Sequence, residues 1–284
     1  MKMKIISNTF DNYNRQTVAV DSWRYLKNLY PEIEIINLQF KDEENEYHNF
    51  YPDLTTKFSI VESSKTLLPN AEKKLPCVRD LFNAGIEEDC EYFITTNADV
   101  IIMPSLIDYI KNNKPDAMAC SRLDIEEIDS FQRILDRTVK PVRWEPAGYD
   151  TFVFKKEWAV KNKQYFQNPY FIGKPKYDVV WAGYMKIFGD NTPLGNGYPP
   201  FCFHIHHGNS SCYLESVEKD WNHGILKTEH LDCLMHNIMV LHLKMNLLKR
   251  TPWGSFLNIS DNERKFEKDF FETLSIHNPD PQII

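Results

Sequence analysis

The stretch from residue 91 to residue 110 constrains the fold most strongly. It opens with Tyr92–Thr96, a run of aromatic and β-branched residues that is typical of a buried strand. The chain then passes through Asn97 and Asp99 into a second apolar run, and Ser105 is a candidate N-cap for a short helix. The pattern therefore predicts a polar pair just beyond the carboxyl end of a strand, which is where open α/β sheets bind ligands.

Asn97 and Asp99 are two residues apart, so in an extended chain both side chains would leave the same face. Two oxygen donors on one face suit Mg²⁺ or Mn²⁺, which can also hold a diphosphate. Asn and Asp are also common turn formers, so a plain turn after the strand is the alternative.

The amino-terminal segment predicts a parallel sheet. Lys4–Asn8 reads as a strand, 15–30 as a helix and Glu34–Phe40 as a second strand, which together form a strand–helix–strand unit. The first loop would open on the same edge as Asn97, so Thr9 is a candidate nucleotide contact, with an ordinary loop residue as the alternative. We expect an α/β protein.

The next helix is expected over Ala71–Gly85, with Gly85 as its C-cap. Arg79 on this helix is a candidate phosphate contact, and an ion pair with a surface carboxylate is its alternative role. Two more strands are expected at 116–121 and 150–154.

Composition excludes some classes of function. The 284-residue chain carries 33 basic and 40 acidic residues, so its net charge of −7 speaks against general nucleic-acid binding. Its apolar runs are too short to span a bilayer and its start lacks a signal-peptide layout, which predicts a cytoplasmic location, with peripheral attachment to the inner membrane as a variant. Six cysteines without a Cys-x-x-Cys pair predict free thiols.

Over roughly residues 1 to 210, the order of these elements resembles the nucleotide-sugar half of GT-A fold glycosyltransferases. The Asp-x-Asp element of that family corresponds here to Asn97-Ala98-Asp99, with Asn in place of the first Asp. Three further groups follow in the order that many bacterial GT-A-like enzymes show: Gly148/Asp150, Gly173/Pro175/Asp178 and His204/His207.

This resemblance implies a GT-A-like, Rossmann-like domain over 1–212, with a mixed, mostly parallel sheet flanked by helices, and a helical carboxyl-terminal appendage over 213–284. It implies transfer of a sugar from a nucleotide-diphosphate sugar, with a UDP-sugar as the expected donor. The acceptor would be a hydroxyl of a glycan, a lipid-linked molecule or another compound, and Mn²⁺ or Mg²⁺ would assist.

The resemblance also implies roles for single residues. Asp99 would hold the metal and His204 or His207 would complete its ligands, with His206 as a rival because it shares a face of an extended segment with His204. The expected donor contacts come from four separate segments: Thr9, Arg79, Asn97 and Asp150. Asn97 would assist the metal or contact the ribose, and Asp150 would contact the sugar or the acceptor.

Asp178 is the expected catalytic base. It lies at the start of a predicted helix, where the helix dipole favours its anion, and a carboxylate there would take the proton of the acceptor hydroxyl in an inverting transfer. A purely structural N-cap is the alternative. Trp144, Tyr149, Trp181 and Tyr184 are candidates for a sugar-stacking platform or for the core.

Two helices are expected near the carboxyl end, at 229–249 and 261–274. They would cap the domain, pair in a homodimer or help to hold an acceptor.

Two other functions remain open. A nucleotidyltransferase of related architecture would carry a glycine-rich loop after the first strand, and the loop SNTFDNYNRQ contains no glycine. A non-catalytic carbohydrate-binding protein would use the histidine cluster to hold a structural zinc ion.

Overall fold

A computed structural model describes residues 1–10, 14–68, 70–71, 73–174, 177–197, 200–206 and 221–222. His207, the helices expected at 229–249 and 261–274, and all of the expected 213–284 appendage except residues 221–222 lie outside this part of the chain.

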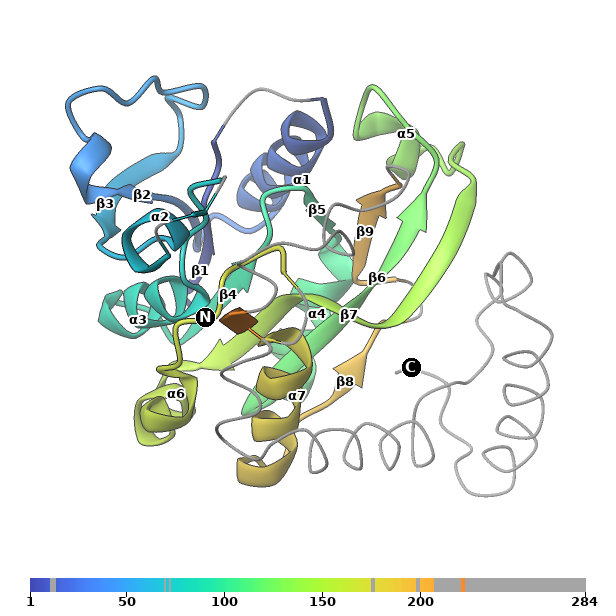
Figure 1. Ribbon diagram of the computed structural model, residues 1–284. Coiled ribbons are helices and arrows are strands. Elements are labelled where there is room, and N and C mark those ends of the chain that lie inside the picture. The colour runs from blue at the N-terminus through green and yellow to red at the C-terminus, as the bar shows by residue number, and fades with distance from the viewer. Residues whose placement is uncertain are drawn as a thin grey trace, which may run out of the picture.

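The described residues form a nine-stranded sheet in the order β3-β2-β1-β4-β7-β6-β9-β5, and β8 pairs with β6 (Figure 1). The strands are β1 (Met3–Ser7), β2 (Ile33–Phe40), β3 (Thr55–Ile60), β4 (Tyr92–Thr96), β5 (Val100–Ile102), β6 (Ala117–Ile125), β7 (Pro141–Lys155), β8 (Leu194–Gly195) and β9 (Cys202–Ile205). Five pairings are parallel, namely β1–β2, β1–β4, β2–β3, β6–β8 and β6–β9, whereas β4–β7, β6–β7 and β5–β9 are antiparallel.

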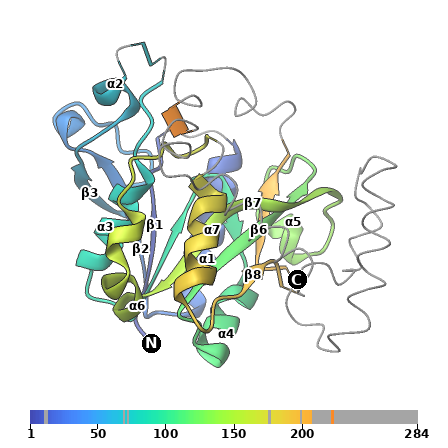
Figure 2. The same cartoon turned by 60° about the horizontal axis from the view of Figure 1, so that its bottom comes forward.

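Helices cover both faces of the sheet. They are α1 (Asn14–Leu29), α2 (Ser64–Leu67), α3 (Val78–Glu87), α4 (Pro104–Asn113), α5 (Gln132–Leu135), α6 (Lys156–Lys161) and α7 (Tyr177–Phe188), with 3₁₀ turns η1 (Lys41–Glu43) and η2 (Lys163–Phe166). One core cluster contains the apolar side chains of α1 and α4, and the other contains those of α3, α6 and α7, which lie together in Figure 2. The expected fold class, a mixed and mostly parallel sheet flanked by helices, is confirmed.

Strand β4 shows why its sequence reads as a continuous apolar run. Tyr92 and Ile94 pack in the cluster with α1 and α4, whereas Phe93 packs in the opposite cluster with α3 and α7. All five residues of the strand are buried. A central strand that is covered on both faces needs apolar residues at successive positions rather than an alternating pattern.

The sequence places the start and the end of α3 wrongly. The helix begins at Val78, because Cys77 forms a β-bridge with Phe171 and the Val78 amide donates to the Tyr170 carbonyl at 2.9 Å. These contacts hold the preceding chain extended. Gly85 is not a C-cap but lies inside the helix, where an added Cβ would come within 2.2 Å of the Phe93 ring. The glycine therefore permits close packing of α3 on β4.

Helix α4 also begins earlier than Ser105. Met103 is its N-cap residue and Pro104 is its first residue, a position where the missing N–H of proline costs nothing. The Ser105 hydroxyl instead donates to the Pro200 carbonyl at 2.7 Å. Ser105 therefore ties α4 to the segment that leads into β9.

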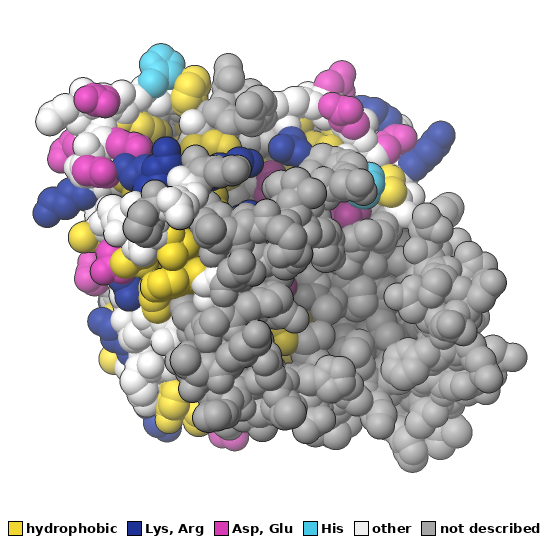
Figure 3. All heavy atoms as spheres, viewed as in Figure 1, with side chains coloured by type: hydrophobic (Ala, Val, Ile, Leu, Met, Phe, Trp, Pro, Cys, Tyr) yellow, Lys and Arg dark blue, Asp and Glu magenta, His cyan; other side chains and the backbone are white. Residues whose placement is uncertain are grey.

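Charged side chains of both signs are interspersed along the upper part of the face shown in Figure 3. Among the described residues, partly exposed ion pairs include Lys74 with Asp42 at 2.8 Å and Arg24 with Asp53 at 2.5 Å. Pairs of this kind contribute little to stability.

Across the described segments, every helix is too short or too polar to traverse a lipid bilayer. Cys77, Cys90, Cys120 and Cys202 are free thiols, as expected.

Candidate active site

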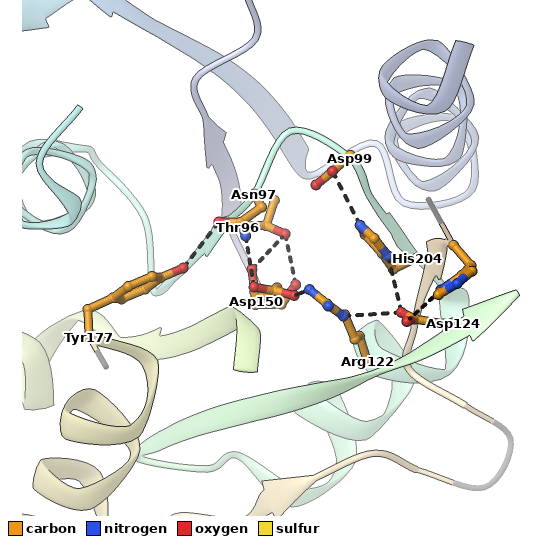
Figure 4. Close-up of polar contacts among 10 residues, drawn as sticks. Thr96, Asn97, Asp99, Arg122, Asp124, Asp150, Tyr177 and His204 are labelled. Atoms are coloured by element: carbon orange, nitrogen blue, oxygen red, sulfur yellow. Dashed lines mark hydrogen bonds and ion pairs between the residues drawn. The ribbon is translucent and has the colours of Figure 1, made fainter. Parts of the chain in front are cut away.

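The candidate site lies at the edge where the carboxyl ends of β1, β4, β6 and β9 meet. The Ser7 hydroxyl donates to the Thr96 carbonyl at 2.8 Å and so joins the ends of β1 and β4. Strand β7 runs the opposite way, so its residue Asp150 lies beside the end of β4, and the Asn97 amide donates to the Asp150 carbonyl at 3.0 Å. Figure 4 shows the side chains that converge at this edge.

Three side chains form a carboxylate–histidine–carboxylate series: Asp99 in the turn before β5, His204 on β9 and Asp124 on β6. His204 Nδ1 lies 3.1 Å from an Asp124 oxygen, and His204 Nε2 lies 3.3 Å from Asp99 Oδ2 (Figure 4). His204 and Asp124 are buried, whereas the Asp99 side chain is 30% exposed. The series therefore runs from the interior of the sheet to a carboxylate that solvent can reach.

The two carboxylates determine the charge of His204. Burial lowers the pKa of His204, but Asp99 and Asp124 outweigh it and raise the pKa to about 9. At neutral pH both ring nitrogens therefore carry a proton and each donates to a carboxylate. Burial also raises the pKa of Asp124, but the hydrogen bond from His204 and the nearby positive charges lower it below its usual range overall.

The pair of Asp99 and His204 fits a divalent cation. Adjacent ligands of an octahedral ion with bonds of 2.0–2.1 Å lie about 3 Å apart, close to the observed 3.3 Å between Nε2 and Oδ2. The cation would replace the Nε2 proton, and Asp124 on Nδ1 would orient the ring in the manner of carboxylates behind metal-bound histidines. Within the described residues no group of three His, Cys, Asp or Glu side chains is arranged to hold a metal. Water and a bound diphosphate would have to supply other ligands.

His206 also contacts Asp124, through Nδ1 at 3.4 Å, and its side chain is 37% exposed. His204 and His206 therefore share a face, as the alternation of an extended segment predicts. Of the two, only His204 reaches Asp99, so the geometry favours His204 over its rival as a ligand.

Arg122 joins this series to a second cluster. Its Nη1 lies 2.5 Å from Asp150 and its Nε lies 3.1 Å from Asp124. The β6–β7 register shifts on both sides of Ser121, and such irregularities re-aim side chains beside active sites. Arg122 and Asp124 were assigned no role from the sequence, although their spacing of two at the end of a strand places them on one face.

The second cluster contains Asn97, Asp150 and Tyr177. Asn97 Nδ2 donates to Asp150 Oδ1 at 2.8 Å, and the Tyr177 hydroxyl donates to Asn97 Oδ1 at 3.2 Å. Residues 98 and 99 form a turn, and the Val100 amide donates to the Asn97 carbonyl at 3.3 Å. The expected extended segment with both side chains on one face is therefore wrong, since Asn97 turns toward Asp150 and Asp99 toward His204.

Thr9 and Arg79 lie outside both clusters. The Thr9 amide donates to Asn37 Oδ1 at 3.0 Å at the end of β1, and its buried hydroxyl has no hydrogen-bond partner among the described residues. Arg79 pairs with Glu62, the surface-carboxylate role that the sequence analysis named as its alternative.

Asp178 lies in the first turn of α7 and is half-buried. Burial first, and then the charge of Asp178, raises the pKa of Tyr149. The pKa of buried Tyr177 is also raised, chiefly by burial and then by Asp150 and Asp178. Asp178 therefore lies near the Asn97 cluster, at a helix amino terminus that favours its ionised form.

A small cavity of about 10 Å³, roughly the size of one water molecule, lies beside this cluster. Its lining is mostly apolar and includes Asn97, Asp150, Tyr177 and Trp181. Three members of the expected stacking platform, Tyr149, Trp181 and Tyr184, are buried core residues. The side chain of Trp144, the fourth member, is not among the side chains that the structure describes.

The fold and the described side chains define an α/β protein with a carboxylate–histidine pair at the carboxyl edge of its parallel strands. No protein-family model matches the sequence, and no curated protein matches it. Its fold is similar to that of S. aureus TarS in complex with UDP-GlcNAc, with 10% sequence identity and a TM-score of 0.48 over 96% of this chain and 82% of that chain. It is similar to that of TarS in complex with UDP, with 12% sequence identity and a TM-score of 0.49 over 93% of this chain and 77% of that chain. It is also similar to that of the Pyrobaculum calidifontis mannosyltransferase PcManGT in complex with GDP-Man and Mn²⁺, with 10% sequence identity and a TM-score of 0.41 over 98% of this chain and 86% of that chain.

Proposed function

We propose that the chain is a glycosyltransferase that moves a sugar from a nucleotide-diphosphate sugar to an acceptor hydroxyl with the help of Mn²⁺ or Mg²⁺. The observation that carries this proposal is the Asp99–His204–Asp124 series at the carboxyl edge of the sheet. It offers one solvent-accessible carboxylate and one oriented imidazole, which is a partial ligand set. Sites completed by substrate phosphates are typical of Mg²⁺ and its relatives.

Asp99 and His204 would hold the cation, which would supply positive charge to the diphosphate as it leaves. Asp124 keeps the His204 ring in place through Nδ1. Arg122 stays between two carboxylates and thereby balances the charge of the buried acids. A UDP-sugar remains our expected donor.

Asp178 is the proposed base. Its place at the start of α7 favours a carboxylate that accepts the proton of the acceptor hydroxyl as the new bond to the sugar forms. A base that acts directly on the acceptor belongs to a single displacement, so we propose inversion at the anomeric carbon.

A thermal-shift screen tests this function. The purified protein is melted with UDP, GDP, CDP, ADP or dTDP, each with and without Mn²⁺. A ligand at 100 times its Kd stabilises the native state by about 2.7 kcal/mol, which raises the Tm of a domain of this size by roughly 5–10 °C. We expect such a rise for one nucleotide, and only with the metal.

The same assay with nucleoside triphosphates added, together with a measurement of zinc content, separates the alternatives. A rise with a nucleoside triphosphate in place of the diphosphate would favour a nucleotidyltransferase. No rise with any nucleotide, together with stoichiometric zinc in the purified protein, would favour the zinc-holding carbohydrate-binding protein.

A further inference from the structure

Both ends of the side-chain amide of Asn97 make a hydrogen bond within the protein. Its Nδ2 donates to Asp150 at 2.8 Å, and its Oδ1 accepts from the Tyr177 hydroxyl at 3.2 Å. The donor end of the amide faces a carboxylate, which accepts hydrogen bonds, and its acceptor end faces a phenol, which can donate its proton. In this arrangement each end of the amide is directed at a protein side chain.

Asp150 is engaged in the same way. One carboxylate oxygen accepts from Asn97 and the other accepts from Arg122, and the side chain is only 12% exposed. A carboxylate at position 97 would therefore face the carboxylate of Asp150 with no proton between them. Two like charges at hydrogen-bond distance disfavour the ionised state of both groups.

Tyr177 connects this cluster to α7. It is buried and is the first residue of the helix, directly before Asp178. Its hydrogen bond to Asn97 therefore fixes the start of α7 against the end of β4, and Asn97 is itself two residues before Asp99. Burial raises the pKa of the Tyr177 phenol well above its usual range, so the hydroxyl keeps the proton that it donates.

We infer that Asn97 is a positioning residue: its amide links Asp150 on β7 to Tyr177 on α7 and thereby holds Asp178 in a fixed position relative to Asp99. This inference rests on the proposed function for the roles of Asp99 and Asp178. It accounts for Asn at a position where the resembled family carries Asp, since only a group that both donates and accepts satisfies Asp150 and Tyr177 together. Asn97 acts through its neighbours and not as a metal ligand.

Exchanging the amide at position 97 and the carboxylate at position 150 tests this inference. In Asn97→Asp two carboxylates oppose each other, and in Asp150→Asn two amide N–H₂ groups do. In the double variant the Asn at 150 donates to the Asp at 97 and accepts from Arg122, while the Asp at 97 accepts from Tyr177. Every hydrogen bond is then restored with the same total charge, and only the bond between positions 97 and 150 changes direction.

Stability without any ligand is the first readout. We expect each single variant to lower the Tm by about 5 °C or more, and the double variant to recover more than half of the loss. Asn28→Asp is the matched control, because Asn28 is exposed on α1, and it should change the Tm by less than about 2 °C. Losses that simply add in the double variant would overturn the inference.

Activity and metal affinity are the second readout. In Asn97→Asp we expect kcat to fall by about tenfold to a hundredfold, because Asp178 is misplaced. The Kd for Mn²⁺ should stay within about threefold of wild type. In the double variant we expect kcat to recover. If residue 97 were instead a metal ligand, Asn97→Asp would bind Mn²⁺ more tightly and the Asp150→Asn change would not rescue kcat, which would overturn the inference.

The two readouts separate this inference from the proposed function. Wild-type protein that neither binds a nucleotide nor transfers sugar refutes the function, and the ligand-free stability cycle then still decides whether Asn97 links Asp150 to Tyr177. Active wild-type protein without thermodynamic coupling between positions 97 and 150 refutes the inference alone.

Discussion

Replacing Asp124 by Asn would disturb the centre of the site without removing a proposed metal ligand. The Asp124 side chain is only 2% exposed, and it contacts His204 at 3.1 Å, His206 at 3.4 Å and Arg122 at 3.1 Å. The amide keeps the shape of the carboxylate but removes its charge, and it presents an N–H₂ group where the carboxylate had an acceptor oxygen. The positive charges of His204 and Arg122 would then lose a shared partner.

The contacts allow the size of the effect to be worked out. Removal of one partner from a buried ion pair costs about 3–5 kcal/mol. The Asn oxygen retains one acceptor, so we expect the lower end, about 3 kcal/mol, which corresponds to a fall in Tm of roughly 6–12 °C. Loss of the carboxylate behind a metal-bound histidine weakens metal binding by about 10–100-fold.

Two measurements follow from this. Thermal unfolding of the metal-free protein gives the change in Tm, and titration with Mn²⁺ in the presence of the stabilising nucleotide, followed by the electron paramagnetic resonance signal of free Mn²⁺, gives the affinity. Asp89→Asn is the control, because Asp89 is 93% exposed and pairs with Lys2 far from the site. A variant Asp124→Asn that melts and binds Mn²⁺ like the control would refute the reasoning.

Three more predictions follow from the same structure. Asp99→Ala should abolish the metal-dependent part of the nucleotide-induced rise in Tm, while lowering the metal-free Tm less than Asp124→Asn does, because Asp99 is 30% exposed; an unchanged metal-dependent rise would place the metal elsewhere. Asp178→Asn should lower kcat by at least about 100-fold with donor binding within about twofold, as steady-state kinetics and calorimetry would show; a kcat within tenfold of wild type would mean that another group is the base. Gly85→Ala should lower the Tm by roughly 2–12 °C, because the added Cβ would overlap the Phe93 ring. The nucleotide-induced rise in Tm should be retained. An unchanged Tm in differential scanning calorimetry would show that the ring moves aside at no cost.

Local patterns predicted the sheet well. The buried strand at Tyr92–Thr96 was recognisable from its composition, and the strand–helix–strand unit at the start of the chain implied the parallel pairing of β1 with β2. The same patterns misplaced the ends of α3, because Cys77 is held extended by residues about 90 positions later and because Gly85 serves packing against Phe93. Contacts between residues so far apart in the sequence cannot be predicted from a local pattern.

The site was only partly predictable for the same reason. Asp99, Asp178 and His204 could be named because each stands in a recognisable local setting, although their roles remain predictions. Asp124 and Arg122 were missed because their meaning depends on partners on other strands, with His204 lying 80 residues beyond Asp124. Asn97 was read as a ligand candidate, and the hydrogen bonds that suggest another role come from residues 150 and 177.

The most direct test of the central claim is donor turnover. Purified wild-type protein and Asp99→Ala are incubated with Mn²⁺ and a panel of nucleotide sugars, with water as the simplest acceptor hydroxyl, and the released nucleoside diphosphate is measured over time. The proposed function predicts that wild-type protein releases the diphosphate from one donor class, that a chelator stops this release, and that Asp99→Ala does not support it. Release from no donor, or equal release by Asp99→Ala, would contradict a metal-assisted glycosyl transfer at this site.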